Sequence, residues 1–585
     1  MKCKIGIRLI VDGRDTVRDV IEDKAKLMGK AAEKLITSTL TYSDGTPVEC
    51  ITGITAICCA KEAIMVEEQF IKENVVATLS VTPSFCYGTE TLDLNPHTIK
   101  AIWGFNSTER PGAVYLACAQ ACYAEKGLPV FSIYGKDVQD MDDNTIPVDV
   151  AEKILLFAKS SIAVGEMKNT SYLAIGNVSM GIIGSYVDSL MLQQYLAMRS
   201  EWIDMSEVKR RIDKEIYDKK EYAKALLFVK KNCQIGIDYN DKEKQHSQEQ
   251  KEIDWEYSVK MAIIFKDLMQ GNETLKTMGY REESYGHGAI VAGFQGQRQW
   301  TDYLPNADFA EAILNSSFDW NGVRKPYILA TENDSLNGLS MLFQHLLTKG
   351  AAIFADVRTF WSNESIKRVT GKELTGIGRD GFIHLNNSGA AALDGAGVMK
   401  ENKKPVIKKW FDVTNKDVEA MLKATDWCAA NLNYFKSGGY SSHYVTRAEM
   451  PMTMFRINRI LGVGPVMQIV EGYSLDLDRQ ISDIVEKRTD PGWPSTFFTP
   501  ILTGKGQFTD VYSVMKAWGA NHCSIAYGHI GHELITLAAM LRMPVCMHNV
   551  DRKRIYRPQV WDSFGTENLE SADYLACKTL GPLYK

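Results

Sequence analysis

The sequence predicts an α/β protein made of two doubly wound units and a third, β-richer unit. Short apolar runs alternate with helix-length segments through the first 349 residues, as in a parallel sheet covered by helices on both faces. Beyond residue 350 the chain is richer in glycine, aromatic residues and short strand-like runs. A chain of 585 residues also exceeds what one hydrophobic core usually serves. We therefore expect domains at 1–168, 169–349 and 350–585.

The first unit shows the strand–helix alternation most clearly, because each apolar run is followed by an amphipathic segment of helical length. The expected strands are Lys4–Val11, Val48–Thr52, Asn74–Val81 and Val130–Tyr134, and the expected helices are Asp15–Leu40, Ala56–Ile71, Ala113–Glu125 and Val148–Val164.

The second unit is predicted to begin with a strand over Ser171–Gly176. The glycines at 176, 181 and 184 do not fit the G-x-G-x-x-G spacing, so this turn does not predict a nucleotide site. Residues 205–270 are mostly helical in pattern and strongly charged, and we interpret 240–254 as a solvated connector that carries His246 at the surface. In the third unit, Val466–Val470 and Phe497–Leu502 read as strands.

Composition excludes several classes of protein. The formal net charge is −5 and no long run of Lys and Arg occurs, so nucleic acid is not an expected partner. No stretch approaches 18 uninterrupted apolar residues, and the N-terminal segment does not form a signal peptide, so we expect a cytoplasmic protein without membrane contact. The twelve cysteines include no C-x-x-C pair, which favours a reducing compartment.

Two acids follow neighbouring apolar runs in the second half of the chain. Glu332 comes after Tyr327–Thr331 and Asp356 after Ala351–Ala355, with a predicted helix between them. This spacing suits a βαβ crossover, whose strand ends face one crevice. The alternatives are that Glu332 serves the start of the helix and that Asp356 pairs with Arg358. Asp334 or Ser335 is the expected N-cap.

Two neighbouring carboxylates repel, so a site that holds both needs a cation or a shared proton. The stretch from Trp518 to His532 contains three histidines, and His522 follows a Gly-Ala-Asn turn that suits a residue aimed into a cleft. Oxygen ligands with one imidazole favour Mn²⁺ or Mg²⁺ over zinc. His529 and His532 are interpreted as helix-start or surface residues.

Amides and aromatic rings suit a hydroxyl-rich ligand, because amides both donate and accept hydrogen bonds and a ring covers the apolar face of a sugar. Residues 292–302 (AGFQGQRQWTD) combine both, and Phe85, Tyr440 and Trp493 stand in similar surroundings. A polar interface between domains explains the 292–302 segment equally well.

Several longer motifs resemble the L-fucose isomerase family. They are Pro111–Ala117 (PGAVYLA), Phe131–Gly135 (FSIYG), Phe294–Arg298 (FQGQR), Ile313–Arg324 (ILNSSFDWNGVR), Ala330–Gly338 (ATENDSLNG), Phe354–Thr359 (FADVRT), Thr503–Val514 (TGKGQFTDVYSV) and Gly519–His522 (GANH). The resemblance extends from about Lys4 to Lys585.

The resemblance implies a fold and an activity. The fold is α/β, with two doubly wound α/β domains followed by a mixed C-terminal domain with β-barrel character. The activity is the interconversion of L-fucose and L-fuculose, and of D-arabinose and D-ribulose. The family's metal ligands match Glu332, Asp356 and His522, with Mn²⁺ preferred over Mg²⁺. A homohexamer with substrate sites between subunits is implied as well.

The resemblance also implies substrate contacts at Gln295, Tyr440, Trp493 and Asn521, and at Arg14 toward a neighbouring subunit. Phe85 departs from the family pattern, which has tryptophan there, so the stacking face is kept and the indole donor is lost.

The implied chemistry moves a carbonyl between C1 and C2 through a cis-enediolate. A metal bound to both oxygens stabilises that charge, and Glu332 and Asp356 act as acid and base. Which of the two removes the carbon-bound proton is left open. The alternatives are a non-catalytic sugar-binding or regulatory protein, which leaves the three predicted metal ligands without a purpose, and a metal-dependent sugar hydrolase.

Overall fold

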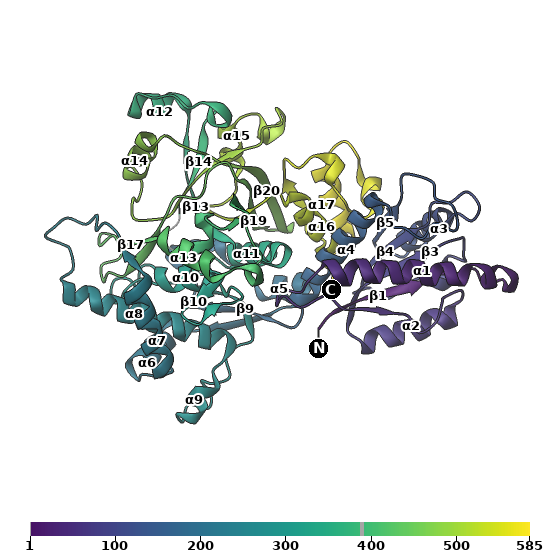
Figure 1. Ribbon diagram of the computed structural model, residues 1–585, viewed down its shortest axis with the longest axis horizontal. Coiled ribbons are helices and arrows are strands. Elements are labelled where there is room, and N and C mark those ends of the chain that lie inside the picture. Colours follow the sequence, from purple (N-terminus) through teal and green to yellow (C-terminus); the bar gives the residue numbers. More distant parts are fainter. Residues whose placement is uncertain (1, 387–390) are drawn as a thin grey trace.

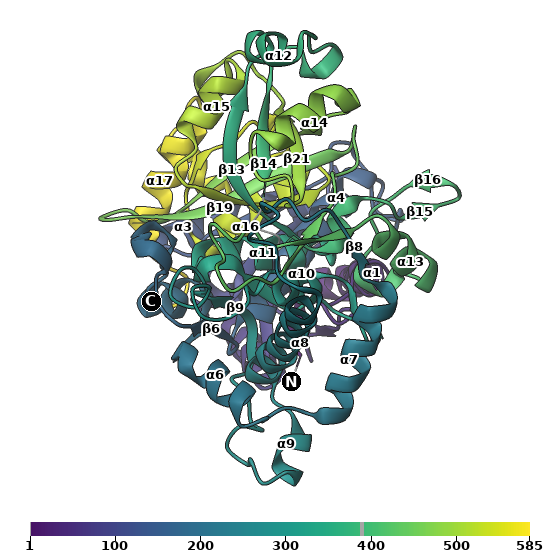
Figure 2. The ribbon, with the colours of Figure 1, turned by 90° about the vertical axis from the view of Figure 1, so that its left-hand side faces the viewer.

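The computed structural model describes residues 2–386 and 391–585. It is elongated, with the first sheet at one end of the long axis and the second sheet and a β-barrel at the other (Figure 1). Figure 2 shows the barrel strands above the second unit, whose helices α8 (Gln248–Gln270) and α10 (Asp308–Asn315) face the viewer. The predicted fold class is therefore confirmed, whereas the boundaries after residues 168 and 349 stay predictions.

The first sheet is parallel and has the strand order β2-β1-β3-β4-β5. One of its strands, β4, is absent from the expectation above, because Thr98 and Lys100 interrupt its apolar run. Apolar side chains of α1 and α4 form one core and those of α2 and α3 another, so helices cover both faces as predicted. The elements are β1 (Lys4–Leu9), α1 (Asp15–Thr39), β2 (Cys50–Thr52), α2 (Ala60–Lys72), β3 (Val75–Thr82), β4 (Ile99–Gly104), α3 (Gly112–Glu125), β5 (Val130–Tyr134) and α4 (Val148–Met167).

The second sheet is also parallel, in the order β12-β9-β6-β7. Helices α8 and α10 cover one face, and α5 and α11 cover the other. Its remaining elements are β6 (Ser171–Ile175), α5 (Ser189–Leu196), β7 (Arg199–Ile203), α6 (Met205–Asp213), α7 (Lys219–Asn232), α9 (Glu273–Thr277), β9 (Ala289–Phe294), a hairpin of β10 (Phe318–Asp319) and β11 (Gly322–Val323), β12 (Ile328–Ala330) and α11 (Ser335–Thr348).

The third unit contains an antiparallel barrel of six strands, in which β19 pairs with β20 and closes the circle β19-β22-β13-β14-β21-β20. A barrel leaves no free edge, which removes the risk of edge-to-edge pairing. The strands are β13 (Ile353–Trp361), β14 (Phe382–Asn386), β19 (Pro451–Ile460), β20 (Gly464–Ser474), β21 (Ser495–Pro500) and β22 (His522–Tyr527), and β23 (Val545–Met547) adds to β20 in parallel.

Smaller elements surround the barrel and join it to the other units. The short strand β8 (Gln234–Ile235) of the second unit pairs with β17 in the third. Helix α16 packs against α4 of the first unit, so the C-terminal helices lie between the barrel and the first sheet (Figure 1). The elements are α12 (Asn363–Thr370), β15 (Lys400–Glu401), β16 (Lys404–Pro405), α13 (Asn415–Lys423), β17 (Asp426–Ala429), β18 (Tyr440–His443), α14 (Arg479–Lys487), α15 (Val511–Ala517), α16 (Gly531–Leu541) and α17 (Leu569–Leu580).

Helix α11 shows where the expected βαβ crossover is wrong. The strand before it, β12, belongs to the second sheet, whereas the strand after it, β13, is in the barrel and pairs antiparallel with β14 and β22. The helix is buried from Ser335 to Leu347 and contacts β9, β12, β19 and β22. Each large apolar side chain that it buries contributes about 1.5–3 kcal/mol. A helix shared by two sheets therefore connects the two acids.

Among the described residues, no helix has the length and apolar character that crossing a bilayer requires.

Candidate active site

The site lies where the second sheet meets the barrel, and three elements supply its central side chains. Glu332 follows β12, Asp356 is on β13 and His522 begins β22. Asp356 and His522 are direct partners across the antiparallel pair β13–β22. The pairing register of β13 and β22 thus places Asp356 beside His522, and the turn after β12 adds Glu332, although the three residues are far apart in the sequence.

Glu332 is held in a left-handed turn. Its φ is 58° and that of Asn333 is 50°, which side chains other than glycine adopt at a cost of about 1–3 kcal/mol. The Asn333 side chain offsets this cost, because it donates to the carbonyl of Asn177 at 3.1 Å and accepts from the Tyr172 hydroxyl at 2.7 Å. Gly293 leaves room for this contact, since a Cβ there would lie 2.5 Å from Asn333 Oδ1. The turn directs Glu332 toward the barrel.

The imidazole of His522 is the centre of an acidic cluster. Its Nε2 lies 3.2 Å from Asp356 Oδ1 and 3.7 Å from Glu332 Oε2, and its Nδ1 lies 2.6 Å from Asp334 Oδ2. The Asn521 amide also lies 3.0 Å from Nε2. The bond at Nδ1 fixes the ring orientation, so Nε2 faces the two predicted acids.

Asp334 is a central residue that the sequence prediction gave only a capping role. It does cap α11, accepting from the amide of Asn337 at 2.9 Å, and it also accepts from Arg456 at 2.7 Å. Both charged side chains are completely buried. Although burial alone would raise it, the pKa of Asp334 is held at about 2 by Arg456 and His522. The alternative role expected for Glu332, at the start of the helix, is therefore filled by Asp334, which caps α11.

The electrostatics of the cluster favour a positive charge at its centre. Burial raises the pKa of Glu332 to about 7, with further increases from Asp356 and Asp334 that His522 partly offsets. Burial opposes charge on His522, yet Asp334 and Asp356 raise its pKa to about 10. In the structure the carboxylates of Glu332, Asp334 and Asp356 gather around the imidazole of His522. Two carboxylates and one imidazole suit a hard or borderline divalent ion.

Two further acids lie behind Glu332 on α10. Glu311 accepts from the Thr331 hydroxyl at 3.0 Å, and Asp308 accepts from Ser441. Burial raises the pKa of each well above its ordinary value, and Glu332 contributes to both increases. Sequence reasoning missed this pair, although two acids three residues apart in the apolar run DFAEAIL signal buried, functional carboxyls.

Arg358 connects the acids to an aromatic side chain. It donates to Asp356 Oδ2 at 3.2 Å, pairs with Asp490, and lies 5.5 Å from the centre of the Trp493 ring. Asp356 therefore contacts both Arg358, which is the alternative partner expected from the sequence, and His522. One predicted substrate residue, Asn521, contacts His522 directly, and another, Trp493, is linked to Asp356 only through Arg358.

Gln295 directly follows β9 and lines a cavity of about 540 Å³ at the carboxyl edge of the second sheet, with Asn177 and Asp204. Its Oε1 accepts from the amide of Asn177 at 2.7 Å, and the carbonyl of Asn177 accepts from Asn333. Gln295 is therefore two hydrogen bonds from the turn that holds Glu332.

The other predicted substrate residues lie farther from the acids in this chain. Tyr440 is buried and stacks on Trp255 at 4.1 Å, whereas its neighbour Ser441 contacts Asp308. Arg14 and Phe85 belong to the first unit, whose sheet is at the opposite end of the molecule from the barrel (Figure 1). Both are exposed, with 65% of the Arg14 side chain and 37% of Phe85 accessible.

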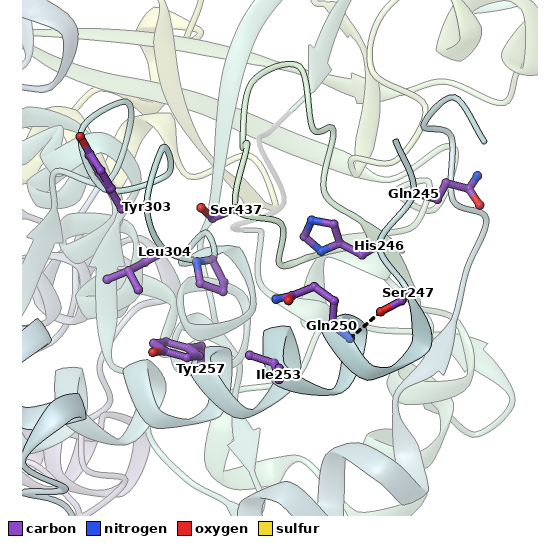
Figure 3. A pocket seen from close by; sticks show the side chains of 10 residues that line it. Gln245, His246, Ser247, Gln250, Ile253, Tyr257, Tyr303, Leu304 and Ser437 are labelled. Atoms are coloured by element: carbon purple, nitrogen blue, oxygen red, sulfur yellow. Dashed lines mark hydrogen bonds between the residues drawn. The ribbon is translucent and has the colours of Figure 1, made fainter. Parts of the chain in front are cut away.

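A second cavity, of about 600 Å³, lies beside α8 and is lined by residues of the polar connector (Figure 3). His246 points into it, with Nδ1 fixed at 2.8 Å from the buried Asp254. The side chain of His246, interpreted above as a surface histidine, is 20% exposed and pairs with the buried Asp254 of α8. Glu332, Asp356 and His522 do not line this cavity.

Comparison with known proteins covers almost the whole chain. Family models described as the first N-terminal, second N-terminal and C-terminal domains of L-fucose isomerase match residues 2–169, 170–349 and 385–548. Curated proteins named L-fucose isomerase from Bacteroides thetaiotaomicron and Clostridium perfringens are each 55% identical, and one from Streptococcus pneumoniae is 54% identical. Each alignment covers 100% of this chain and 99% of the relative.

Proposed function

The chain belongs to the L-fucose isomerase family and is an aldose–ketose isomerase of L-fucose and L-fuculose, and we propose that Glu332, Asp356 and His522 carry this reaction around a bound divalent cation. The observation that supports the proposal most strongly is the convergence of both acids on His522 Nε2, at 3.2 and 3.7 Å.

The three donors suit Mn²⁺, with Mg²⁺ as the second choice. Mg²⁺ prefers oxygen ligands alone and thiophilic ions prefer thiolates, whereas this site offers two carboxylate oxygens and one imidazole nitrogen. When bound, the cation supplies electrostatic stabilisation to the oxygens on C1 and C2. His522 would offer Nε2 to it, while Asp334 holds Nδ1 and keeps the ring in position.

The proton transfer falls to the carboxylates. One acid takes the proton from C2 of the aldose and returns a proton to C1, through a cis-enediolate of the sugar. We assign this role to Glu332, because Asp356 is also bound by Arg358 and is less free to move. Asp356 then assists at the hydroxyl groups. Burial raises the pKa of Glu311 and that of Asp308 well above their ordinary values, which disfavours further negative charge near Glu332.

The same geometry supports D-arabinose as a second substrate, with D-ribulose as its product. D-Arabinose has the configuration of L-fucose at C2, C3 and C4, so the hydroxyls next to the reacting carbons present the same pattern. Trp493 and Asn521 would contact either sugar at the mouth of the acid cluster.

We also propose a homohexamer in which the first unit of one subunit completes the site of another. Arg14, Phe85 and the neighbouring Tyr87 are exposed on the first unit, whose sheet lies at the opposite end of the molecule from the barrel that carries Asp356 and His522 (Figure 1). An exposed cation with two exposed rings is the composition expected of a sugar-facing surface.

The test is an assay for ketose formation from a panel of aldoses, run in D₂O with and without chelator. Proton transfer predicts deuterium at the carbon that receives the proton, whereas a direct hydride shift would leave that carbon unlabelled. A sugar-binding protein would form no ketose, and a hydrolase would cleave a glycoside instead. The convergent acids and the enzymatic family both disfavour those two alternatives.

A further inference from the structure

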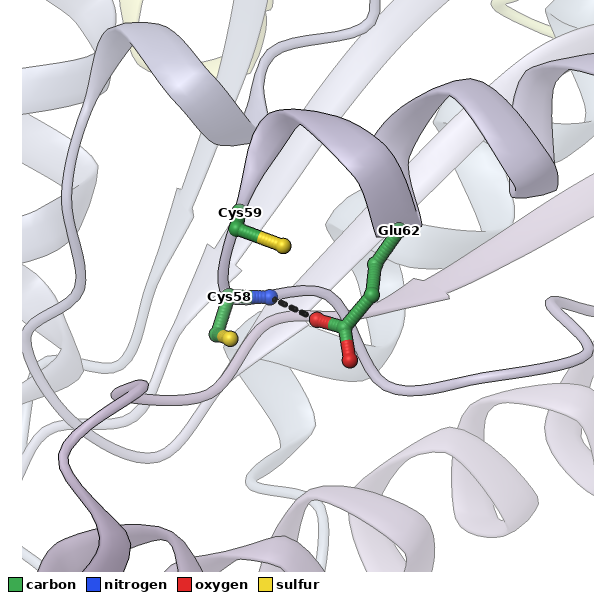
Figure 4. Close-up of side chains that lie close together, drawn as sticks. All are labelled: Cys58, Cys59 and Glu62. Atoms are coloured by element: carbon green, nitrogen blue, oxygen red, sulfur yellow. Dashed lines mark hydrogen bonds between the residues drawn. The ribbon is translucent and has the colours of Figure 1, made fainter.

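Three potential metal ligands outside the sugar site meet at the start of α2. The ligand atoms of Cys58, Cys59 and Glu62 all lie within 4.8 Å of one another. Figure 4 shows the two thiols and the carboxylate on the same side of the chain, at the first turn of the helix. All three are half-buried, so the group is accessible to an ion from solvent. Both cysteines are free thiols.

Glu62 is already positioned for a ligand role. Its Oε2 accepts from the amide of Cys58 at 2.8 Å, and its Oε1 accepts from Arg18 at 2.9 Å. A carboxylate offers about four lone-pair sites, so both hydrogen bonds leave capacity for a metal. The two bonds fix the carboxylate beside the thiols, which lowers the conformational cost of binding.

We propose that Cys58, Cys59 and Glu62 form a second cation site, selective for a thiophilic divalent ion of the zinc class. Two soft thiolates dominate this donor set, although its third member is a hard carboxylate, whereas the sugar site has two carboxylates and an imidazole and no sulfur. The sites would therefore bind different ions.

Charge balance supports this site. A divalent ion with two thiolates and one carboxylate has a net charge of −1, and Arg18, which also pairs with Glu22, places a positive charge 3.3 Å from Cys58 Sγ. Binding forms two metal–sulfur bonds and releases two thiol protons to solvent, so no oxidant or other reactant is needed.

The turn at Gly13 of the same chain leaves space for the Cys58 thiol. A Cβ at Gly13 would lie 3.0 Å from Cys58 Sγ, so a side chain at this position would crowd the sulfur. The site therefore lies directly under the turn of Asp12, Gly13 and Arg14.

The experiment uses Cd²⁺ as a spectroscopic substitute for Zn²⁺, added to the full-length, Mn²⁺-saturated protein without thiol reductants. A sulfur-to-cadmium charge-transfer band should appear and saturate at one ion per chain. The double variant Cys58→Ser/Cys59→Ser should lose the band, and Glu62→Gln should weaken binding about tenfold or more. The matched control is Cys118→Ser/Cys122→Ser, which removes the paired thiols of α3 and should keep the band.

A second measurement needs no variant. Cd²⁺ should protect Cys58 and Cys59 of the wild-type protein from alkylation, read by peptide mass spectrometry, while the half-buried thiols of Cys118 and Cys122 still react. Absence of a saturable band, a band unchanged in the double variant, or alkylation unaffected by Cd²⁺ would each overturn the proposal. Neither readout depends on sugar turnover, so failure here is distinct from failure of the proposed isomerase site.

Discussion

His522 Nδ1 lies 2.6 Å from Asp334 Oδ2, and the same carboxylate oxygen accepts from Arg456 at 2.7 Å. Asp334 therefore joins the start of α11 to two barrel strands and orients the imidazole. A buried carboxylate that serves a helix, an arginine and a histidine together is a positioning residue for the acid cluster. Its replacement tests whether the cluster depends on this contact.

Asp334→Asn should keep the helix cap, because asparagine is an equally good N-cap, and should remove the negative charge beside Arg456. Breaking a buried ion pair costs about 3–5 kcal/mol. The loss of the bond to His522 should weaken metal binding about 10–100-fold. Urea denaturation and Mn²⁺ titration measure the two effects. Asp510→Asn, at the cap of α15 on the surface, is the control and should change stability by about 1 kcal/mol at most.

Glu332→Gln should fold normally and lose turnover by about 10³-fold, because it removes the proposed base while keeping the shape of the side chain. The comparison variant is Glu311→Gln. Burial raises the pKa of Glu311 well above its ordinary value, which favours its neutral form, so the neutral and similarly shaped glutamine should preserve turnover within about threefold. Equal losses in the two variants would contradict the assignment of Glu332, and steady-state kinetics on L-fucose distinguish the outcomes.

Mn²⁺ binding should release protons. Against the effect of burial, Asp334 and Asp356 raise the pKa of His522 to about 10, and burial raises the pKa of Glu332 to about 7. Near neutral pH the metal is therefore expected to displace one proton from His522 and a partly bound proton from Glu332. A cation competes with these protons, and its apparent affinity should therefore rise with pH. Calorimetry in buffers of different ionisation enthalpy should detect between one and two protons per ion at about pH 7. Release of none would contradict the proposed ligands.

Asp267, on α8, provides a test of stability away from the site. Burial raises its pKa from 3.8 to about 7, although Asn272 donates to it. A carboxyl with a raised folded-state pKa stabilises the fold fully below about pH 4, and this contribution is lost as the pH rises through about 7. Asp267→Asn should remove that loss and be more stable than the wild type at about pH 8 by up to a few kcal/mol. Urea denaturation at about pH 5 and pH 8 checks the sign.

The sequence predicts the donors of the site but not the way they meet. Apolar runs before Glu332 and Asp356 correctly indicate buried strands, yet periodicity cannot assign β12 to one sheet and β13 to another. The partners of a strand depend on side chains far along the chain, and the Asp356–His522 register is such a long-range property. Arg456 could have been identified earlier, because a charged residue within the apolar strand MTMFRIN needs a buried partner.

The subunit arrangement is testable by mixing inactive variants. Arg14→Ala removes the exposed cation of the first unit, and Glu332→Gln removes the proposed base. If Arg14 serves a neighbouring subunit, random mixed oligomers contain sites with Glu332 from one variant and Arg14 from the other, and about a quarter of wild-type turnover returns. If both residues served the site of their own chain, mixing would restore nothing. Glu332→Gln mixed with Asp356→Asn is the control and should stay inactive, because both acids come from the same chain.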